Sequence, residues 1–145
     1  MIRIVLTGLL ICFFGSPSWA QNNEAIAVIV HPDNRVEVMD VRELRRIFLG
    51  KRKTFADGRA IHPITQLDSS IAEPFNQTVV RRSTIKLQSY WSKMLFSGGG
   101  NPPVLADNDQ AVKALVTADS EAIGYIRASA ADASVKVILT IDLAQ

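Results

Sequence analysis

Cysteine is nearly absent from this 145-residue chain, and its one cysteine, Cys12, lies in an apolar segment near the start. From residue 21 onward the chain has no thiol, which excludes a disulfide, a thiolate metal site and a cysteine nucleophile there. The chain also lacks a strong excess of charge of one sign, because 16 basic and 14 acidic residues leave a net charge of +2. That balance argues against a protein built mainly to coat nucleic acid, although it excludes neither a basic patch nor an anionic ligand.

Long hydrophobic runs are missing as well, apart from one at the amino terminus. Residues 4–14 are almost wholly apolar, follow a basic residue and precede Pro17 and a few small residues. As a helix such a run spans only about 16 Å, which is too short for the ~30 Å hydrocarbon core of a membrane. The pattern predicts a cleavable secretory signal peptide over residues 1–20, followed by one exported domain over residues 21–145.

Hydrophobic periodicity predicts a mixture of strands and helices. Continuous β-branched runs indicate strands, and apolar residues spaced three and four apart indicate helices. In chain order we expect a strand at 25–30, a helix at 40–50, a strand at 60–66, helices at 68–82, 83–96 and 108–118, and strands at 122–126 and 135–141. This alternation predicts an α/β fold, a small mixed sheet with flanking helices.

Two of the predicted helices carry apolar stripes that we expect to face the core. In the helix at 68–82 the stripe consists of Ile71, Phe75, Thr78 and Val79. In the helix at 83–96 it consists of Leu87, Tyr90, Trp91, Met94 and Leu95.

No set of catalytic groups can be assembled from the motifs. The chain has no Gly-x-Ser-x-Gly motif, and only His31 and His62 could act as an imidazole base. Both histidines lie beside a proline without metal-ligand spacing and without a surrounding His/Asp/Glu cluster, so we interpret them as solvated turn residues. The glycines at 98–100 precede Pro-Pro rather than a Lys-Ser/Thr pair and a helix, which is not the pattern of a phosphate loop. We therefore expect no enzyme, no cofactor and no metal.

Seven basic residues gather within a short segment, namely Arg42, Arg45, Arg46, Lys51, Arg52, Lys53 and Arg59. A nucleic-acid surface would need interleaved aromatic side chains for stacking, whereas Phe48 belongs to the predicted core face. A predicted signal peptide also sends the protein out of the cytoplasm, so we expect no nucleic-acid partner. A solvated helix face, or docking to an acidic partner or anionic surface, remains open for this segment.

Asp68, Ser69 and Ser70 open a predicted helix directly after a predicted strand. Free N–H groups and the positive end of the helix dipole attract an anion at such a place, and hydroxyl groups can add hydrogen bonds. Ordinary N-capping is the other interpretation, because Asp68 and Glu73 bring negative charge to the position that an anion would take.

Several sequence blocks occur in an order typical of one protein family. They are residues 30–34, 44–51, 55–64, 75, 90–91, 96–98, 102–103 and 122–126. Together they resemble the phosphate-type substrate-binding proteins of ABC transporters, in a short form about the size of one lobe. The resemblance implies one lobe of a class II periplasmic binding protein, a periplasmic location, and capture of a small oxyanion such as phosphate between two lobes.

The resemblance also implies candidate ligand-binding residues: Ser69, Ser70, Ile71 and Thr65. Full-length members place an arginine four residues before a Ser-Gly-Thr at this helix start. Here the arginine position is Thr65 and the triplet is Ser69, Ser70 and Ile71, so the serine alone is kept. A second copy of the chain could supply donors that the missing second lobe would otherwise provide, which makes self-association one of our expectations.

Two functions therefore remain open. The first is an exported solute-binding domain for ABC-type transport, with phosphate or a similar oxyanion as its ligand. The second is a periplasmic interaction module without transport, which has lost the anion site and contacts an envelope or membrane protein, for example through the basic segment at residues 42–59.

Overall fold

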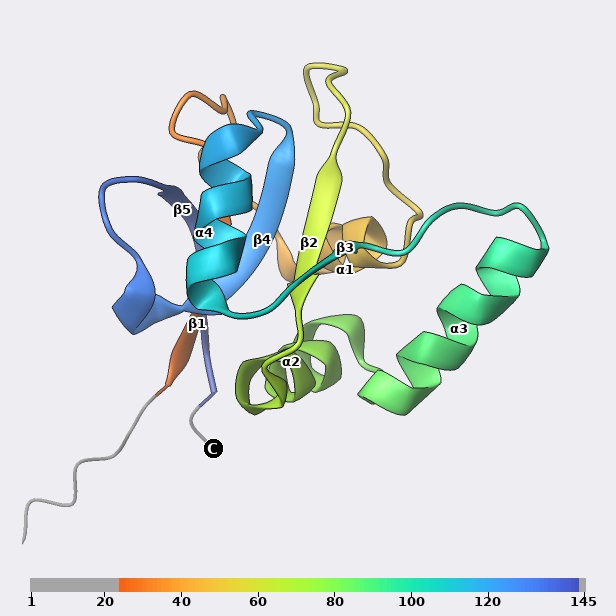
Figure 1. Cartoon of the computed structure of the whole chain (residues 1–145). Coiled ribbons are helices and arrows are strands. Elements are labelled where there is room, and N and C mark those ends of the chain that lie inside the picture. The colour runs from red at the N-terminus through yellow and green to blue at the C-terminus, as the bar shows by residue number, and fades with distance from the viewer. Residues whose placement is uncertain (1–23, 144–145) are drawn as a thin grey trace, which may run out of the picture.

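A five-stranded mixed sheet organises the structure, with the strand order β3-β2-β4-β1-β5 (Figure 1). The computed structural model describes residues 24–143, and the predicted signal peptide over residues 1–20 lies outside them. Helices pack on both faces of the sheet, which confirms the predicted α/β class, a small mixed sheet with flanking helices. None of the helices in the described part of the chain has the length and apolar composition that crossing a membrane requires.

The strands run in mixed directions. β1 is antiparallel to its neighbours β4 and β5, whereas β2 is parallel to both β4 and β3. The strands are β1 (Ala25–Val30), β2 (His62–Gln66), β3 (Val104–Ala106), β4 (Ala122–Arg127) and β5 (Lys136–Asp142). The sequence pattern does not predict β3, because three residues that follow two prolines are too few to show a period.

The helical segments confirm most of the predicted helices. They are α1 (Val41–Phe48), α2 (Ser69–Phe75), the π-helical turn η1 (Asn76–Val80), α3 (Thr84–Phe96), α4 (Asp109–Ala118) and the 3₁₀ turn η2 (Ala128–Ala130). The single α-helix expected over 68–82 is wrong in its second half. Pro74 brings no N–H group to the helix, and the chain widens into η1 before Arg81 ends it with φ of 59°. This turn buries Val79 and Val80 and leaves Thr78 exposed, contrary to the predicted stripe.

Side chains of β1 alternate between two hydrophobic cores, because successive residues of a strand point to opposite faces. Ile26, Val28 and Val30 join the larger core, which also contains buried residues of α1 and α2. Ala27 and Ile29 join a smaller core beneath α4. The continuous apolar run that predicted a buried strand is thus explained by helices on both faces.

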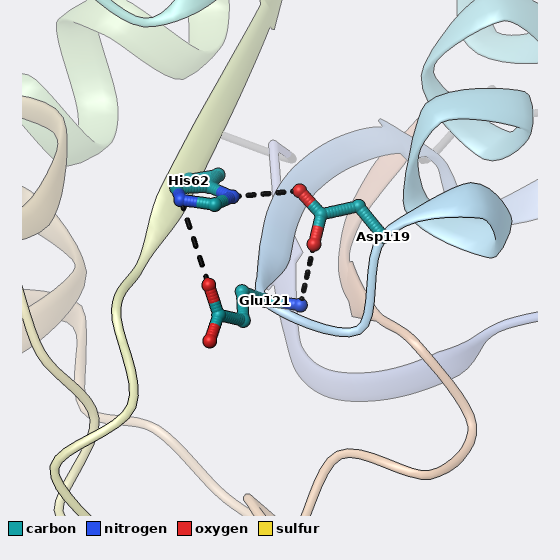
Figure 2. Close-up of side chains that lie close together, drawn as sticks. All are labelled: His62, Asp119 and Glu121. Atoms are coloured by element: carbon teal, nitrogen blue, oxygen red, sulfur yellow. Dashed lines mark hydrogen bonds and ion pairs between the residues drawn. The ribbon is translucent and has the colours of Figure 1, made fainter.

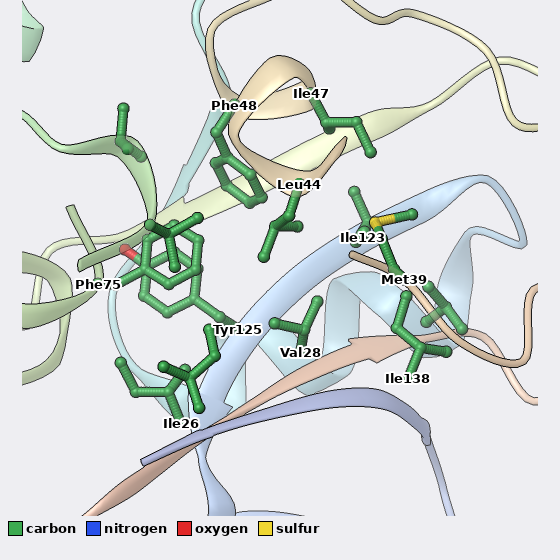
Figure 3. Packing of buried hydrophobic residues seen from close by; sticks show 14 of the residues in the cluster. Ile26, Val28, Met39, Leu44, Ile47, Phe48, Phe75, Ile123, Tyr125 and Ile138 are labelled. Carbon is green, nitrogen blue, oxygen red and sulfur yellow. The ribbon is translucent and has the colours of Figure 1, made fainter. Parts of the chain in front are cut away.

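Three aromatic rings from three different elements meet in the larger core (Figure 3). Phe75 of α2 stacks on Tyr125 of β4 with ring centroids 3.7 Å apart, and Phe48 of α1 meets Phe75 edge-on at 4.9 Å. An edge-on pair such as Phe48 and Phe75 contributes about 0.5–1.5 kcal/mol beyond its burial. The stack holds α2 against β4, and so places the start of α2 near the end of that strand.

The helix α3 projects from the β3 edge of the sheet and buries less than predicted (Figure 1). Of its predicted core stripe, Trp91 is buried, Leu87, Tyr90 and Met94 are partly buried, and Leu95 is 52% exposed. Two contacts hold this helix to the end of α1. The Tyr90 hydroxyl donates to the Leu49 carbonyl at 2.6 Å, and Trp91 packs against Gly50, where a Cβ would lie 2.8 Å from the indole. The predicted stripe is therefore wrong at Leu95, because none of the elements between residues 24 and 143 lies over it to complete a core.

Candidate functional site

The four residues proposed as ligand-binding lie together, where β2 ends and α2 begins. Thr65 is the penultimate residue of β2, and Ser69, Ser70 and Ile71 are the first three residues of α2. In open α/β sheets, ligands bind outside the carboxyl ends of the strands. Ser69 and Ser70 are exposed, whereas the Ile71 side chain is buried in the core, so Ile71 could offer a ligand only its backbone.

Asp68 caps α2 and already accepts hydrogen bonds from backbone N–H groups in the first turn of this helix. Its carboxylate accepts from the Ser70 backbone N–H at 3.1 Å and from the Ser70 hydroxyl at 2.6 Å. Its carbonyl accepts from the backbone N–H groups of Ile71 and Ala72 at 3.2 and 2.9 Å. The N-capping interpretation of this segment is thereby confirmed. An incoming anion would have to replace Asp68 as the acceptor at Ser70.

The Thr65 hydroxyl is engaged from the side of the core. It shares a hydrogen bond of 2.7 Å with the Tyr125 hydroxyl, while burial raises the pKa of Tyr125 to about 12. Next to it, the Gln66 side-chain amide donates to the Tyr125 carbonyl at 2.9 Å and to Asp109 at 3.0 Å. Thr65 therefore supports the site from beneath, and its hydroxyl already has one partner.

Arg127, the last residue of β4, brings a cation to this site, and no sequence pattern predicted it there. Its guanidinium donates to Asp109 at 3.0 Å, to Asp68 at 3.0 Å and to the Ser70 hydroxyl. The hydrogen bonds with Asp109 and Asp68 raise the pKa of Arg127, and those from Ser70 and Arg127 lower the pKa of Asp68. Nothing in the local sequence marks this arginine. Its proximity follows from the pairing of β4 with β2, which brings the two strand ends together.

Acidic groups outnumber the one cation at this strand end. Asp68 and Asp109 both bind Arg127, and the Glu24 carboxylate lies 4.0 Å from its Nε. An oxyanion can bind here only by displacing a carboxylate from the guanidinium, and the carboxylates that remain repel it. The arrangement brings a guanidinium and a hydroxyl group together, as an oxyanion would require, but the carboxylates around them would oppose an anion.

A groove of about 550 Å³ adjoins this site, between α3 and the β2–β3 edge of the sheet. Its lining is mostly apolar and includes Leu67, Leu87, Trp91, Leu95, Pro103 and Leu105. Thr65 and Gln66 form the side of the groove shared with the candidate anion site. Two buried polar atoms of the lining, Gln66 Oε1 and Trp91 Nε1, have no hydrogen-bond partner within the described structure. A ligand or water entering the groove could satisfy them.

A second polar cluster lies at the other end of the sheet, and it corrects the expectation that neither histidine has acidic neighbours (Figure 2). His62 Nδ1 is 2.7 Å from Asp119 Oδ2, and His62 Nε2 is 3.6 Å from Glu121 Oε2. Burial opposes ionisation of Asp119, but hydrogen bonds from His62 and from the Glu121 N–H outweigh it and lower the pKa of Asp119. Sequence spacing could not reveal this cluster, because His62 joins it through the pairing of β2 with β4.

The basic segment at residues 42–59 divides into engaged and exposed side chains. Arg45 donates to the Val79 carbonyl at 2.6 Å, Arg52 pairs with Glu43, and Arg59 pairs with Asp57 at 2.8 Å. The remaining basic side chains, Arg42, Arg46, Lys51 and Lys53, are exposed. The segment thus has structural arginines and a smaller solvent-facing set that could meet an anionic partner.

Comparison with known proteins gives matches at the level of the fold. No protein-family model matches the chain, and no curated protein matches its sequence. Three solved structures match well: a candidate phosphate ABC transporter substrate-binding protein with bound phosphate from Clostridium perfringens (24% identity, TM-score 0.64), an ABC-type phosphate transport receptor from Vibrio cholerae (20%, 0.63) and PstS from Borrelia burgdorferi (14%, 0.60).

These matches cover most of this chain but only part of each of the solved ones. They span 79%, 85% and 79% of this chain, and 44%, 52% and 46% of the Clostridium, Vibrio and Borrelia chains, respectively. The chain thus spans about half the length of the structures that it matches. Its fold is that of a single lobe of a phosphate-type substrate-binding protein, as the sequence resemblance implied.

Proposed function

We propose that this chain is an exported, periplasmic solute-binding protein of the phosphate ABC transporter type, with phosphate or a similar small oxyanion as its ligand. The observation that carries the proposal is the meeting of Arg127 with Ser70 at the start of α2, in a fold shared with phosphate-binding proteins. A guanidinium and a hydroxyl on adjoining elements are donors that suit an oxyanion. Arg127 supplies, from another strand, the cation that the Thr65 position lacks.

Binding in this site exchanges one anion for another. The oxyanion would take the place of Asp68 on the Arg127 guanidinium, on the Ser70 hydroxyl and on the Ser70 N–H, with Ser69 exposed beside them. Asp109 keeps its hold on the opposite side of the guanidinium and fixes its orientation. Because the displaced carboxylate remains close by, we expect weak binding by one chain. A second copy, or a membrane transporter that receives the ligand, could add further donors.

Titration calorimetry of the purified protein with phosphate and with sulfate tests the proposal. We expect saturable binding of one anion per chain, and loss of that binding in Arg127→Gln. Arg46→Gln, which removes an exposed arginine outside the site, is the matched control and should bind as the unchanged protein does. No heat at millimolar phosphate and sulfate, or equal binding by Arg127→Gln, would exclude this site.

A second function is favoured by the charge of the same region. Asp68 and Asp109 already neutralise Arg127, and the exposed side chains of Arg42, Arg46, Lys51 and Lys53 offer positive charge elsewhere. On this alternative the lobe carries no solute and docks on an acidic envelope or membrane protein. Arg42→Glu together with Arg46→Glu should abolish recovery of that partner from envelope extracts. Arg45 is unsuitable for this test because it bonds the Val79 carbonyl.

A further inference from the structure

Three metal-ligating side chains converge at the amino ends of β2 and β4. Each of His62, Asp119 and Glu121 offers one ligand atom, and the three atoms lie within 4.8 Å of one another (Figure 2). His62 is the first residue of β2, whereas Asp119 and Glu121 lie in the turn between α4 and β4. This cluster takes no part in the anion site, which lies beyond the carboxyl ends of the same two strands.

The backbone holds the three side chains in position. His62 lies opposite Ala122 in the β2–β4 pairing, and its N–H donates to the Glu121 carbonyl at 2.9 Å. Asp119 Oδ1 accepts from the Glu121 N–H at 2.9 Å, which turns Oδ2 toward the imidazole. The side chains of the three residues are 51%, 40% and 33% exposed, respectively. A cation can therefore reach them from solvent without any rearrangement of the fold.

The donor set selects a class of ion. One imidazole nitrogen and two carboxylate oxygens suit a divalent transition-metal ion, whereas Ca²⁺ and Mg²⁺ prefer oxygen ligands alone. Two carboxylates also balance the charge of a divalent cation. We propose that His62, Asp119 and Glu121 form a binding site for a divalent transition-metal ion of the Zn²⁺ type.

The His62–Asp119 distance requires little adjustment to admit an ion, whereas the Glu121 side chain must rotate. In a tetrahedral zinc site with bonds of about 2.0–2.1 Å, neighbouring ligand atoms lie about 3.3 Å apart. The separation of 2.7 Å between His62 Nδ1 and Asp119 Oδ2 needs to open only slightly to admit an ion. Glu121 now faces the other ring nitrogen, so its flexible side chain must rotate to the same side. Three protein ligands leave one position for water.

Calorimetric titration of the purified protein with ZnCl₂ tests this site. We expect one Zn²⁺ per chain, and a loss of affinity of at least about tenfold in each of His62→Gln and Asp119→Asn, as for other changes that disturb metal coordination. Asp33→Asn is the matched control, because it removes an exposed carboxylate that follows β1 at the same end of the sheet. Its affinity for Zn²⁺ should equal that of the unchanged protein.

Circular dichroism of each variant shows whether it is folded, and the exposure of His62 and Asp119 makes folding of both variants the expected result. Absence of Zn²⁺ binding up to millimolar concentration would overturn the proposal, as would undiminished binding by His62→Gln. Titration with Ca²⁺ tests whether the imidazole takes part. If Ca²⁺ bound as tightly as Zn²⁺, the carboxylates alone would account for the site, and the imidazole would not be a ligand.

Discussion

The two ends of the β2–β4 strand pair carry similar acidic groups but different cations. At the carboxyl end, Asp68 and Asp109 are held by Arg127, whose guanidinium is charged at every pH at which the protein is folded. At the amino end, Asp119 and Glu121 both face the imidazole of His62. The first end therefore contains its own counter-ion and resists a second anion. The second end has room for a cation from solution.

Removing the fixed cation should have the largest effect. In Arg127→Gln, Asp68 and Asp109 lose their shared partner and repel each other, so we expect the free energy of unfolding to fall by about 2–3 kcal/mol, as for a lost set of hydrogen bonds to a charged group. Urea denaturation measures this change. Arg46→Gln should change stability by less than about 0.5 kcal/mol. Equal stability of the two variants would show that Arg127 does not hold the strand ends together.

Removing one carboxylate from the same end should instead improve anion binding. In Asp68→Asn the repulsion between that carboxylate and a bound oxyanion disappears, so we expect the affinity for phosphate to rise about fivefold. Phosphate titration of this variant beside the unchanged protein is the measurement. Asp40→Asn, which alters the equivalent cap of α1, should leave the affinity unchanged. Weaker binding by Asp68→Asn would mean that the carboxylate assists the ligand.

Acid should remove the contribution that ionised Asp68, at the carboxyl end of the strand pair, makes to the free energy of unfolding. The hydrogen bonds from Ser70 and Arg127 lower the pKa of Asp68 below its unfolded value of about 3.9. Its stabilising contribution is therefore fully present above that value and is lost as the pH falls through the folded pKa. Urea denaturation at pH 7 and at pH 3 should show a smaller loss in Asp68→Asn than in the unchanged protein. An identical loss would assign the acid sensitivity to other carboxylates.

Placing a fixed cation at the amino end should have the smallest effect on stability and should make the two ends alike. In His62→Lys an ammonium group would meet Asp119 and Glu121, and such partly exposed pairs contribute only about 0–1 kcal/mol. Thermal unfolding should show little change, whereas Zn²⁺ should no longer alter it. Persistent stabilisation by Zn²⁺ would place the metal elsewhere.

Local sequence patterns predicted the parts of the fold that depend on neighbours in the chain. The β-branched run at 25–30 and the start of a helix at residue 40 are both confirmed, as is the capping role of Asp68. The predictions of secondary structure and burial were wrong where long-range contacts determine the structure. The strand β3 needs β2 beside it, and Leu95 in the apolar stripe of α3 is left exposed by the described part of the fold. The turn η1 follows a proline whose tolerance in the helix could not be judged from spacing alone.

The candidate sites show the same division. Composition and motif order by themselves determined the fold class, the likeness to a binding-protein lobe and the serines at the start of α2, because these depend on residue type and on spacing along the chain. Only the tertiary structure decided which charges meet. The pairing of β2 with β4 brings Arg127 to Ser70 at one end and His62 to Asp119 and Glu121 at the other. Strand order is set by the packing of the whole core, so no local pattern encodes either contact.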